Sequence, residues 1–187
     1  MTSLRRRSKA GGEIEIQMII DYPAWRSKTK GPDGNSGGGL LLRLEFQSDP
    51  SLLCAVRGTM ERLTEAFGFP EPECRAVTRA VDEALTNIIR HSYKGRLDQP
   101  IEMLLCSVRR QANAEVSDGL EILLCDQGPS IEQADLCMRA LEEVKPGGLG
   151  LHFIKQSMDI VEYKRTNGTN CLRLVKYVRA AKKNVNS

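Results

Sequence analysis

The stretch DEALTNIIRHSY at residues 82–93 decides the fold, because it joins an apolar helical pattern to a ladder of polar side chains. Glu83, Asn87 and His91 are spaced four residues apart, which places them above one another on one helix face. Helical periodicity puts this ladder at the border of the apolar face. A ladder there is either an ordinary solvated edge or one wall of a cleft, and the stretch alone leaves both interpretations open.

The composition is that of a soluble globular chain of one domain. Of the 187 residues, 41% are hydrophobic and 27% are charged, which is ordinary for such proteins. No apolar run reaches the roughly 18–20 residues that span a membrane, and no signal-peptide core follows the basic start. We therefore expect a cytoplasmic protein with no membrane contact.

The net charge of +3 lies entirely in residues 1–39, which hold seven basic and four acidic residues and leave twenty of each sign in the rest. A neutral body gives little support to nucleic-acid binding, which needs a basic patch on the folded surface. The six cysteines are scattered without a CxxC pair. That pattern argues against a zinc site and a disulfide framework, and it predicts free thiols.

The order of elements predicts the architecture. Residues 1–39 are expected to form a basic, glycine-rich, flexible extension in which EIEIQMII is a strand or a short helix. A domain at 40–178 and a tail at 179–187 follow. Within the domain we expect strands at 40–46, 101–108 and 120–126, helices at 51–67, 72–93 and 149–159, and a hairpin turning at Asn167-Gly168. This order favours an α+β two-layer sandwich, with helices on one face of a mixed, mostly antiparallel sheet.

Three stretches carry possible chemistry. On the ladder, the Glu83 carboxylate can act as a general base and the Asn87 oxygen can coordinate Mg²⁺. In CDQGPS at 125–130, Asp126 ends a strand and can accept a hydrogen bond from an exocyclic amine such as that of adenine. A simple turn-forming Asp is the alternative.

The third stretch, PGGLGLHFIKQ at 146–156, opens a helix with glycines that let the backbone approach a phosphate. A flexible hinge before a helix is the alternative. The stretch is not a Walker P-loop, because no Gly-Lys-Ser/Thr is present, and it lacks the βαβ context of a Rossmann fingerprint.

Together and in this order, the three stretches resemble the motifs of the GHKL ATP-binding superfamily, whose fold is the Bergerat sandwich. Within it, EALTNIIRHSYKG, DQGPS and GGLGLHFIKQSMDIVEY are similar to the N box and the two glycine boxes of small bacterial anti-sigma-factor serine kinases of the RsbW and SpoIIAB type. The resemblance covers about residues 40–178.

The resemblance implies a role for each matching position. Glu83 would be the catalytic base and Asn87 the Mg²⁺ ligand, with His91 a supporting residue of the nucleotide site. Asp126 would read adenine, with Gly128 allowing the base to approach. Residues 147–151 (Gly147, Gly148, Leu149, Gly150 and Leu151) would form the ATP phosphate box, at the end of a mobile lid at about 131–147.

Two positions depart from the pattern of these relatives. Ser130 replaces a second glycine after Asp126. Many relatives also carry a threonine near the adenine on a late strand, and the corresponding place here is expected to be Cys171.

Three functional hypotheses follow. The first is an ATP- and Mg²⁺-dependent serine/threonine kinase that phosphorylates a STAS-domain anti-anti-sigma factor, sequesters a sigma factor and forms a homodimer through residues 40–46 and the first helix. The second is a nucleotide-dependent partner-switching module without catalysis, which would have no need of Glu83. A histidine-kinase catalytic domain is disfavoured, because His91 and His152 both lie inside the ATP motifs and no helical hairpin precedes them.

Overall fold

The computed structural model describes residues 2–7, 13–18, 39–112, 115–129 and 149–179. The strands are β1 (Thr2–Arg7), β2 (Glu13–Met18), β3 (Leu40–Gln47), β4 (Pro100–Ala112), β5 (Glu115–Asp126), β6 (Ile160–Thr166) and β7 (Thr169–Tyr177). The helices are the short η1 (Pro50–Leu52), α1 (Leu53–Ala66), α2 (Glu71–Asn87), its continuation η2 (Ile88–Ser92) and α4 (Leu149–Ser157).

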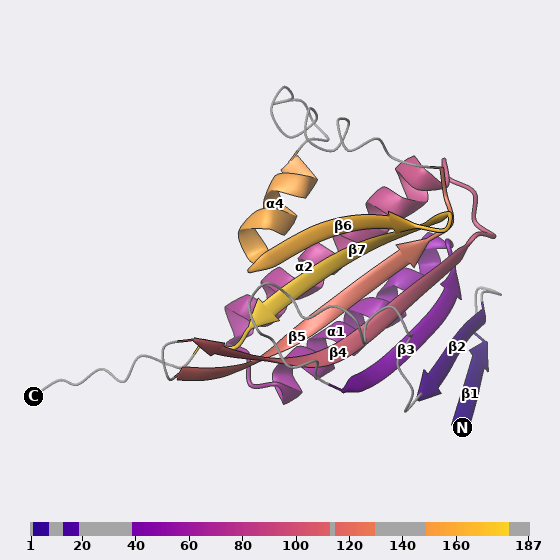
Figure 1. The fold of residues 1–187 in the computed structure, drawn as a ribbon. Helices are drawn as coiled ribbons and strands as arrows, with labels where there is room; N and C mark the ends of the chain where they lie inside the picture. Colours follow the sequence, from indigo (N-terminus) through magenta and orange to yellow (C-terminus); the bar gives the residue numbers. More distant parts are fainter. Residues whose placement is uncertain (1, 8–12, 19–38, 113–114, 130–148, 180–187) are drawn as a thin grey trace, which may run out of the picture.

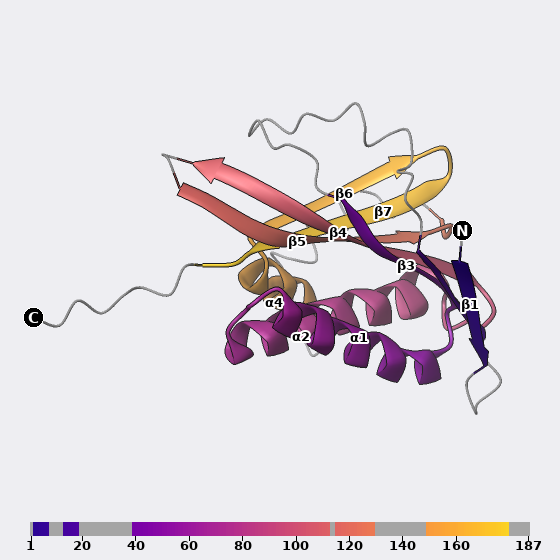
Figure 2. The ribbon, with the colours of Figure 1, turned by 90° about the horizontal axis from the view of Figure 1, so that it is seen from below.

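The strands form one sheet in the order β1-β2-β3-β4-β5-β7-β6, and α1, α2 and α4 cover one of its faces (Figures 1 and 2). This confirms the α+β two-layer sandwich. The sheet was expected to be mixed, but every pairing among the described strands is antiparallel. Consecutive strands joined by hairpins pair in this way, since a parallel pairing needs a long crossover.

The core lies between the helices and the sheet. Val77, Val81 and Ala84 on α2 are at most 2% exposed, and they pack in the same cluster as Met103 of β4 and Leu124 of β5. Alternate residues of β4 and β5 face this cluster, because strand side chains point to opposite faces in turn. The apolar stripe predicted for the second helix is therefore the face that anchors it to the sheet.

Local signals set the helix ends and the last hairpin. The Asp49 side chain accepts a hydrogen bond from the Ser51 N–H at 2.8 Å and opens η1, as an N-cap does. Gly68 follows α1 with φ +79°, a conformation that glycine adopts readily. Asn167 and Gly168 have φ of +51° and +84°, which a two-residue type I′ turn requires at both positions.

One expectation about the strands changes, and one open alternative is decided. The polar stretch 109–119 was expected to link two strands, but β4 runs to Ala112 and β5 starts at Glu115. An ion pair between Arg109 and Asp118 at 2.8 Å spans this exposed extension, so its polar composition reflects solvent rather than a loop. The EIEIQM island is strand β2, which pairs with β1 and with the edge of β3.

The cysteine expectation is wrong for one pair. Cys125 and Cys171 are directly opposed on β5 and β7 and form a disulfide with a Cα–Cα distance of 4.3 Å. Antiparallel register brings two such residues within disulfide reach although 46 positions separate them in the chain. Cys54 and Cys74 are free, as predicted.

Reducing this disulfide is expected to lower the free energy of unfolding by about 3–4 kcal/mol, because a bridge across 46 residues restricts the unfolded chain. Urea unfolding with and without dithiothreitol measures the change. A Cys125→Ala/Cys171→Ala variant is the control, since its transition should not respond to the reductant. Coincident wild-type curves in both conditions would contradict the assignment.

Candidate functional site

The α2 ladder forms one wall of the candidate site. Glu83 and Asn87 are partly exposed and lie one helical turn apart, with Asn87 as the last residue of α2. His91 is exposed on η2, whereas its neighbour Ser92 is buried. Glu83 and Asn87 therefore lie at the border of the core, whereas His91 lies in solvent.

Helix α4 approaches this wall so closely that any side chain at position 150 would have to displace Glu83. A Cβ on Gly150 would lie 2.0 Å from Oε1 of Glu83 and 2.6 Å from its Cδ. Arg79, one turn before Glu83, places its guanidinium 4.4 Å from the ring centre of Phe153 and adds a cation–π contact between the helices. The Glu83 carboxylate thus sits against the start of α4.

The remaining residues predicted for the phosphate box are only partly described. Leu149 begins α4 and Leu151 is partly buried in its first turn. Gly147 and Gly148, together with Ser130 and the lid predicted at 131–147, lie outside the described residues.

Replacing Gly150 by alanine is expected to displace the Glu83 carboxylate and to lower any reaction that uses it at least about ten-fold. The free energy of unfolding should change by about 1 kcal/mol or less, because the flexible end of the glutamate can move and alanine favours a helix. Activity and urea unfolding are measured on the same preparation.

The matched control is Gly58→Ala on α1, where a Cβ would meet nothing within 4 Å. Equal activity of the two alanine variants would contradict the close approach of Gly150 and Glu83.

The second wall is Asp126 at the end of β5, where it is 5% exposed. Its Oδ1 accepts three hydrogen bonds, from Ser92 Oγ at 2.5 Å, the Gly128 N–H at 2.8 Å and Asn170 Nδ2 at 2.9 Å. Within the described part of the chain, Oδ2 receives no hydrogen bond. One oxygen is therefore anchored, and the other is available to accept a hydrogen bond from a ligand's amino group.

The close packing of Ser92 against Asp126 also requires a glycine at position 128. A Cβ there would lie 1.9 Å from Ser92 Oγ and 2.9 Å from Asp126 Oδ1. The turn after β5 can approach η2 only because this position has no side chain.

The segment η2 brings Ser92 to Asp126. It is a π-helical turn, and the Tyr93 N–H bonds to the Ile88 carbonyl five residues earlier. Such turns insert a residue into a helix and often occur at functional sites. Both Ser92 and Tyr93 are buried as a result.

Tyr93 supports the turn that follows Asp126. Its hydroxyl donates to the Pro100 carbonyl at 2.5 Å and accepts from the Gln127 N–H at 2.8 Å. Burial raises the pKa of the Tyr93 phenol above its usual value near 10, so the hydroxyl keeps its proton at neutral pH. The Tyr93 hydroxyl therefore links the backbone that follows Asp126 to the start of β4.

The strand β7 supplies Asn170, which sequence analysis missed. Asn170 pairs with Asp126 across the β5–β7 ladder and is 1% exposed. The late-strand position was assigned to Cys171, but that residue lies on the opposite face in the disulfide. The correction follows from the period of two along a strand, because a shift by one residue moves a side chain to the other face.

The end of β5, the β6–β7 hairpin and the end of α2 gather at one end of the sheet (Figure 1). Among the described residues, no helix is both long and apolar enough to span a membrane, and no group of three or more His, Cys, Asp or Glu is placed to hold a metal ion.

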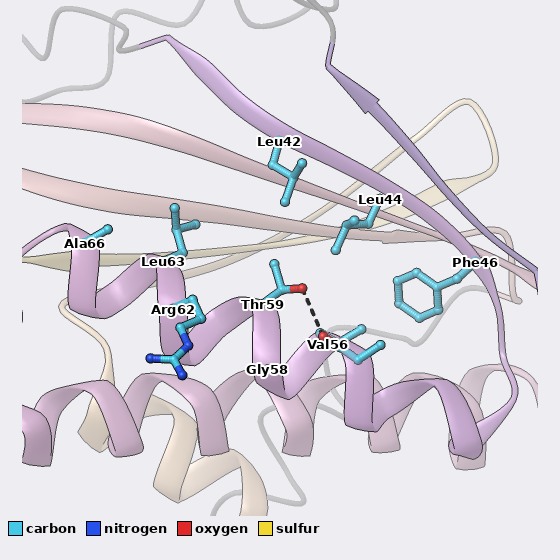
Figure 3. Close-up of a pocket in the computed structure, with 10 residues that line it drawn as sticks. Leu42, Leu44, Phe46, Val56, Gly58, Thr59, Arg62, Leu63 and Ala66 are labelled. Atoms are coloured by element: carbon cyan, nitrogen blue, oxygen red, sulfur yellow. Dashed lines mark hydrogen bonds between the residues drawn. The ribbon is translucent and has the colours of Figure 1, made fainter. Parts of the chain in front are cut away.

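A separate apolar groove lies between α1 and β3 (Figure 3). It measures about 630 Å³, and Leu42, Leu44 and Phe46 of β3 point into it toward α1. Among the described residues that line the groove, Arg62 is the one charged residue. None of these lining residues is among those predicted to carry chemistry.

Comparisons with known proteins match the described domain. The profile of the histidine kinase-like ATPase domain matches residues 46–176. The serine-protein kinase RsbW of Bacillus pumilus is 27% identical over 136 residues, covering 68% of this chain and 80% of the relative. The RsbW of Bacillus subtilis is 25% identical over 152 residues, covering 73% and 85%. The serine/threonine-protein kinase BtrW of Bordetella bronchiseptica is 30% identical over 101 residues, covering 54% and 68%.

Proposed function

The chain belongs to the histidine kinase-like ATPase domain family, and this domain implies ATP binding. We propose that the chain is a protein serine/threonine kinase. Its substrate would be a serine of a STAS-domain anti-anti-sigma factor, and its second partner a sigma factor that it sequesters. The kinase domain would occupy residues 40–178, with residues 1–39 as an extension that adds β1 and β2 to the sheet and 179–187 as a tail.

The observation that carries the proposal is the position of Glu83 against Gly150. A module that only binds a nucleotide has no need of a carboxylate beside the start of the phosphate box. The similarity to two proteins named as serine and serine/threonine kinases supports the same reaction.

The proposed reaction is the transfer of the γ-phosphoryl group of ATP to a serine hydroxyl. The serine Oγ–P bond forms as the bond between the γ-phosphorus and the bridging oxygen breaks, and ADP leaves. Glu83 accepts the hydroxyl proton. Asp126 Oδ2 accepts a hydrogen bond from the adenine amine, with Gly128 permitting the approach, while the backbone of residues 147–151 lies at the phosphates. Holding the reactants in line is the main requirement of phosphoryl transfer.

Magnesium fits the residues present as a companion of the nucleotide. The described residues form no acidic cluster that would hold a metal alone, and Mg²⁺ commonly binds through one or two protein oxygens together with substrate phosphates. Asn87 would supply the protein oxygen. The ion would neutralise charge on the phosphates during transfer.

A homodimer is part of the proposal, with the groove between α1 and β3 as its contact (Figure 3). Leu42, Leu63 and Ala66, each partly or fully exposed, give this groove an accessible apolar lining, and apolar surface is what the core of a homodimer interface buries. Sedimentation velocity of wild type and Leu42→Glu, whose position is partly exposed, measures the oligomeric state. A monomeric wild type would contradict the dimer.

The test of the function is a phosphorylation assay with γ-labelled ATP, Mg²⁺ and STAS-domain proteins from the same cell. Label on a serine of one STAS protein is the expected result. ATP binding with no label on any STAS protein would overturn the kinase and leave the nucleotide-dependent partner-switching module. Absence of ATP binding would overturn both.

A further inference from the structure

One row of side chains crosses three strands beside Asp126. In the register of the sheet, Asp126 of β5 opposes Asn170 of β7, and Asn170 opposes Arg165 of β6. The neighbouring row, one residue along, is Cys125, Cys171 and Lys164, which faces the other side of the sheet. Asp126 is therefore connected to an exposed arginine through a buried carboxamide.

The orientation of this carboxamide is fixed by two donors. Asn170 Oδ1 accepts from Tyr163 Oη at 2.7 Å and from Arg165 Nη1 at 2.5 Å. The guanidinium of Arg165 has no acceptor atom, so it would lose its contact if the NH₂ group of Asn170 took that position. The amide nitrogen must then face the other way.

On that other side Asn170 Nδ2 meets acceptors only. It donates to Asp126 Oδ1 at 2.9 Å, the Gly128 carbonyl at 3.2 Å and the Pro129 carbonyl at 3.4 Å. Arg165 Nη1 also donates to the Gly128 carbonyl at 3.0 Å. One guanidinium thus holds both the amide and the turn that carries Gly128.

This arrangement has a consequence for the base that Asp126 can bind. With Oδ1 occupied by three donors, Asp126 has Oδ2 left to accept a hydrogen bond from a base. A base with an amino group at position 6 satisfies that oxygen, whereas a base with a carbonyl there places two acceptors together. An amide free to turn over would place its oxygen against Asp126 Oδ1 and remove one of the three hydrogen bonds that orient the carboxyl group.

We propose that Arg165 and Asn170 are positioning residues that set selectivity for 6-aminopurine over 6-oxopurine nucleotides. The inference rests on the proposed ATP site at Asp126. Neither side chain needs to touch the base, because both act through the orientation of the Asp126 carboxyl group.

The test compares ATP with ITP. ATP carries an amino group at position 6 of the purine, whereas ITP carries a carbonyl there and a proton on the adjacent ring nitrogen. Dissociation constants for both nucleotides are measured by calorimetry on wild type, Arg165→Met and the matched control Lys164→Met, an exposed lysine in the neighbouring row. We expect Arg165→Met to reduce the ATP-over-ITP preference about five-fold or more, the effect of losing one hydrogen bond to a buried group. Lys164→Met should keep the wild-type preference.

A second variant, Asn170→Asp, tests the inference independently if Arg165→Met does not fold. It replaces the NH₂ group that donates to Asp126 Oδ1 with a carboxyl oxygen, so the Asp126 carboxyl group loses one of the three hydrogen bonds that orient it. Its preference should shift toward ITP by at least the same factor.

Unchanged ATP-over-ITP preference in folded Arg165→Met or Asn170→Asp overturns the inference, as does equal binding of ATP and ITP by wild type, while the ATP site survives in each case. A wild type that binds neither nucleotide overturns the proposed function and this inference together.

Discussion

Glu83→Gln is expected to lower the rate of phosphoryl transfer by about 10²–10⁴-fold, the range for removing a general base. Glutamine keeps the size of the side chain and its packing against Gly150 but cannot take the serine proton. ATP affinity should stay within a few-fold of wild type, because the carboxylate is not proposed to bind the nucleotide. Single-turnover transfer of labelled phosphate at saturating ATP measures the step.

The matched control for this variant is Asp82→Asn, which removes the neighbouring α2 carboxylate. Asp82 pairs with Arg57 of α1 at 2.8 Å, away from Gly150, and its loss should leave the rate near that of wild type. A Glu83→Gln enzyme that transfers phosphate as fast as Asp82→Asn would remove Glu83 from the mechanism.

Asp126→Asn is expected to weaken ATP binding about 10–100-fold. The amide can keep its oxygen toward Ser92, Gly128 and Asn170, but it then presents an NH₂ group where the adenine amine needs an acceptor. Losing a hydrogen bond to a charged group costs about 1.5–3 kcal/mol, which corresponds to that range of affinity. Calorimetric titration with ATP measures the loss.

Asp118→Asn is the control for Asp126→Asn, because Asp118 is exposed and pairs only with Arg109 among the described residues. It should bind ATP as wild type does. Equal ATP affinity in the two asparagine variants would show that Asp126 does not read the base.

The architecture was predictable because its signals are local. The apolar stripe of α2, the Asp49 cap, and the Asn167-Gly168 turn are each defined within a few residues, and each gave the correct element. The limits of β4 and β5 were missed because an exposed antiparallel extension has the same polar composition as a loop. The all-antiparallel pairing follows from hairpin connections rather than from composition.

The polar neighbours of Asp126 were not predictable in the same way. Ser92 and Asn170 lie 34 and 44 positions from Asp126 in the chain, and each depends on a feature without a local signal. Ser92 needs the π turn of η2, and Asn170 needs the register of β5 against β7. The same register explains the disulfide, since Cys125 and Cys171 oppose each other one residue away. An error of one position on β7 exchanged the roles of Asn170 and Cys171.

The proposed kinase reaction takes place at one ATP site lined by α2, the end of β5 and the start of α4. Backbone amide spectra of the ¹⁵N-labelled chain, recorded as ATP and Mg²⁺ are added, locate that site directly. The predicted result is a shift of the Asn87, Gly128 and Leu151 signals, with Leu42 and Leu63 in the groove between α1 and β3 unchanged. Shifts confined to that groove, or no shifts at millimolar ATP, would contradict the account.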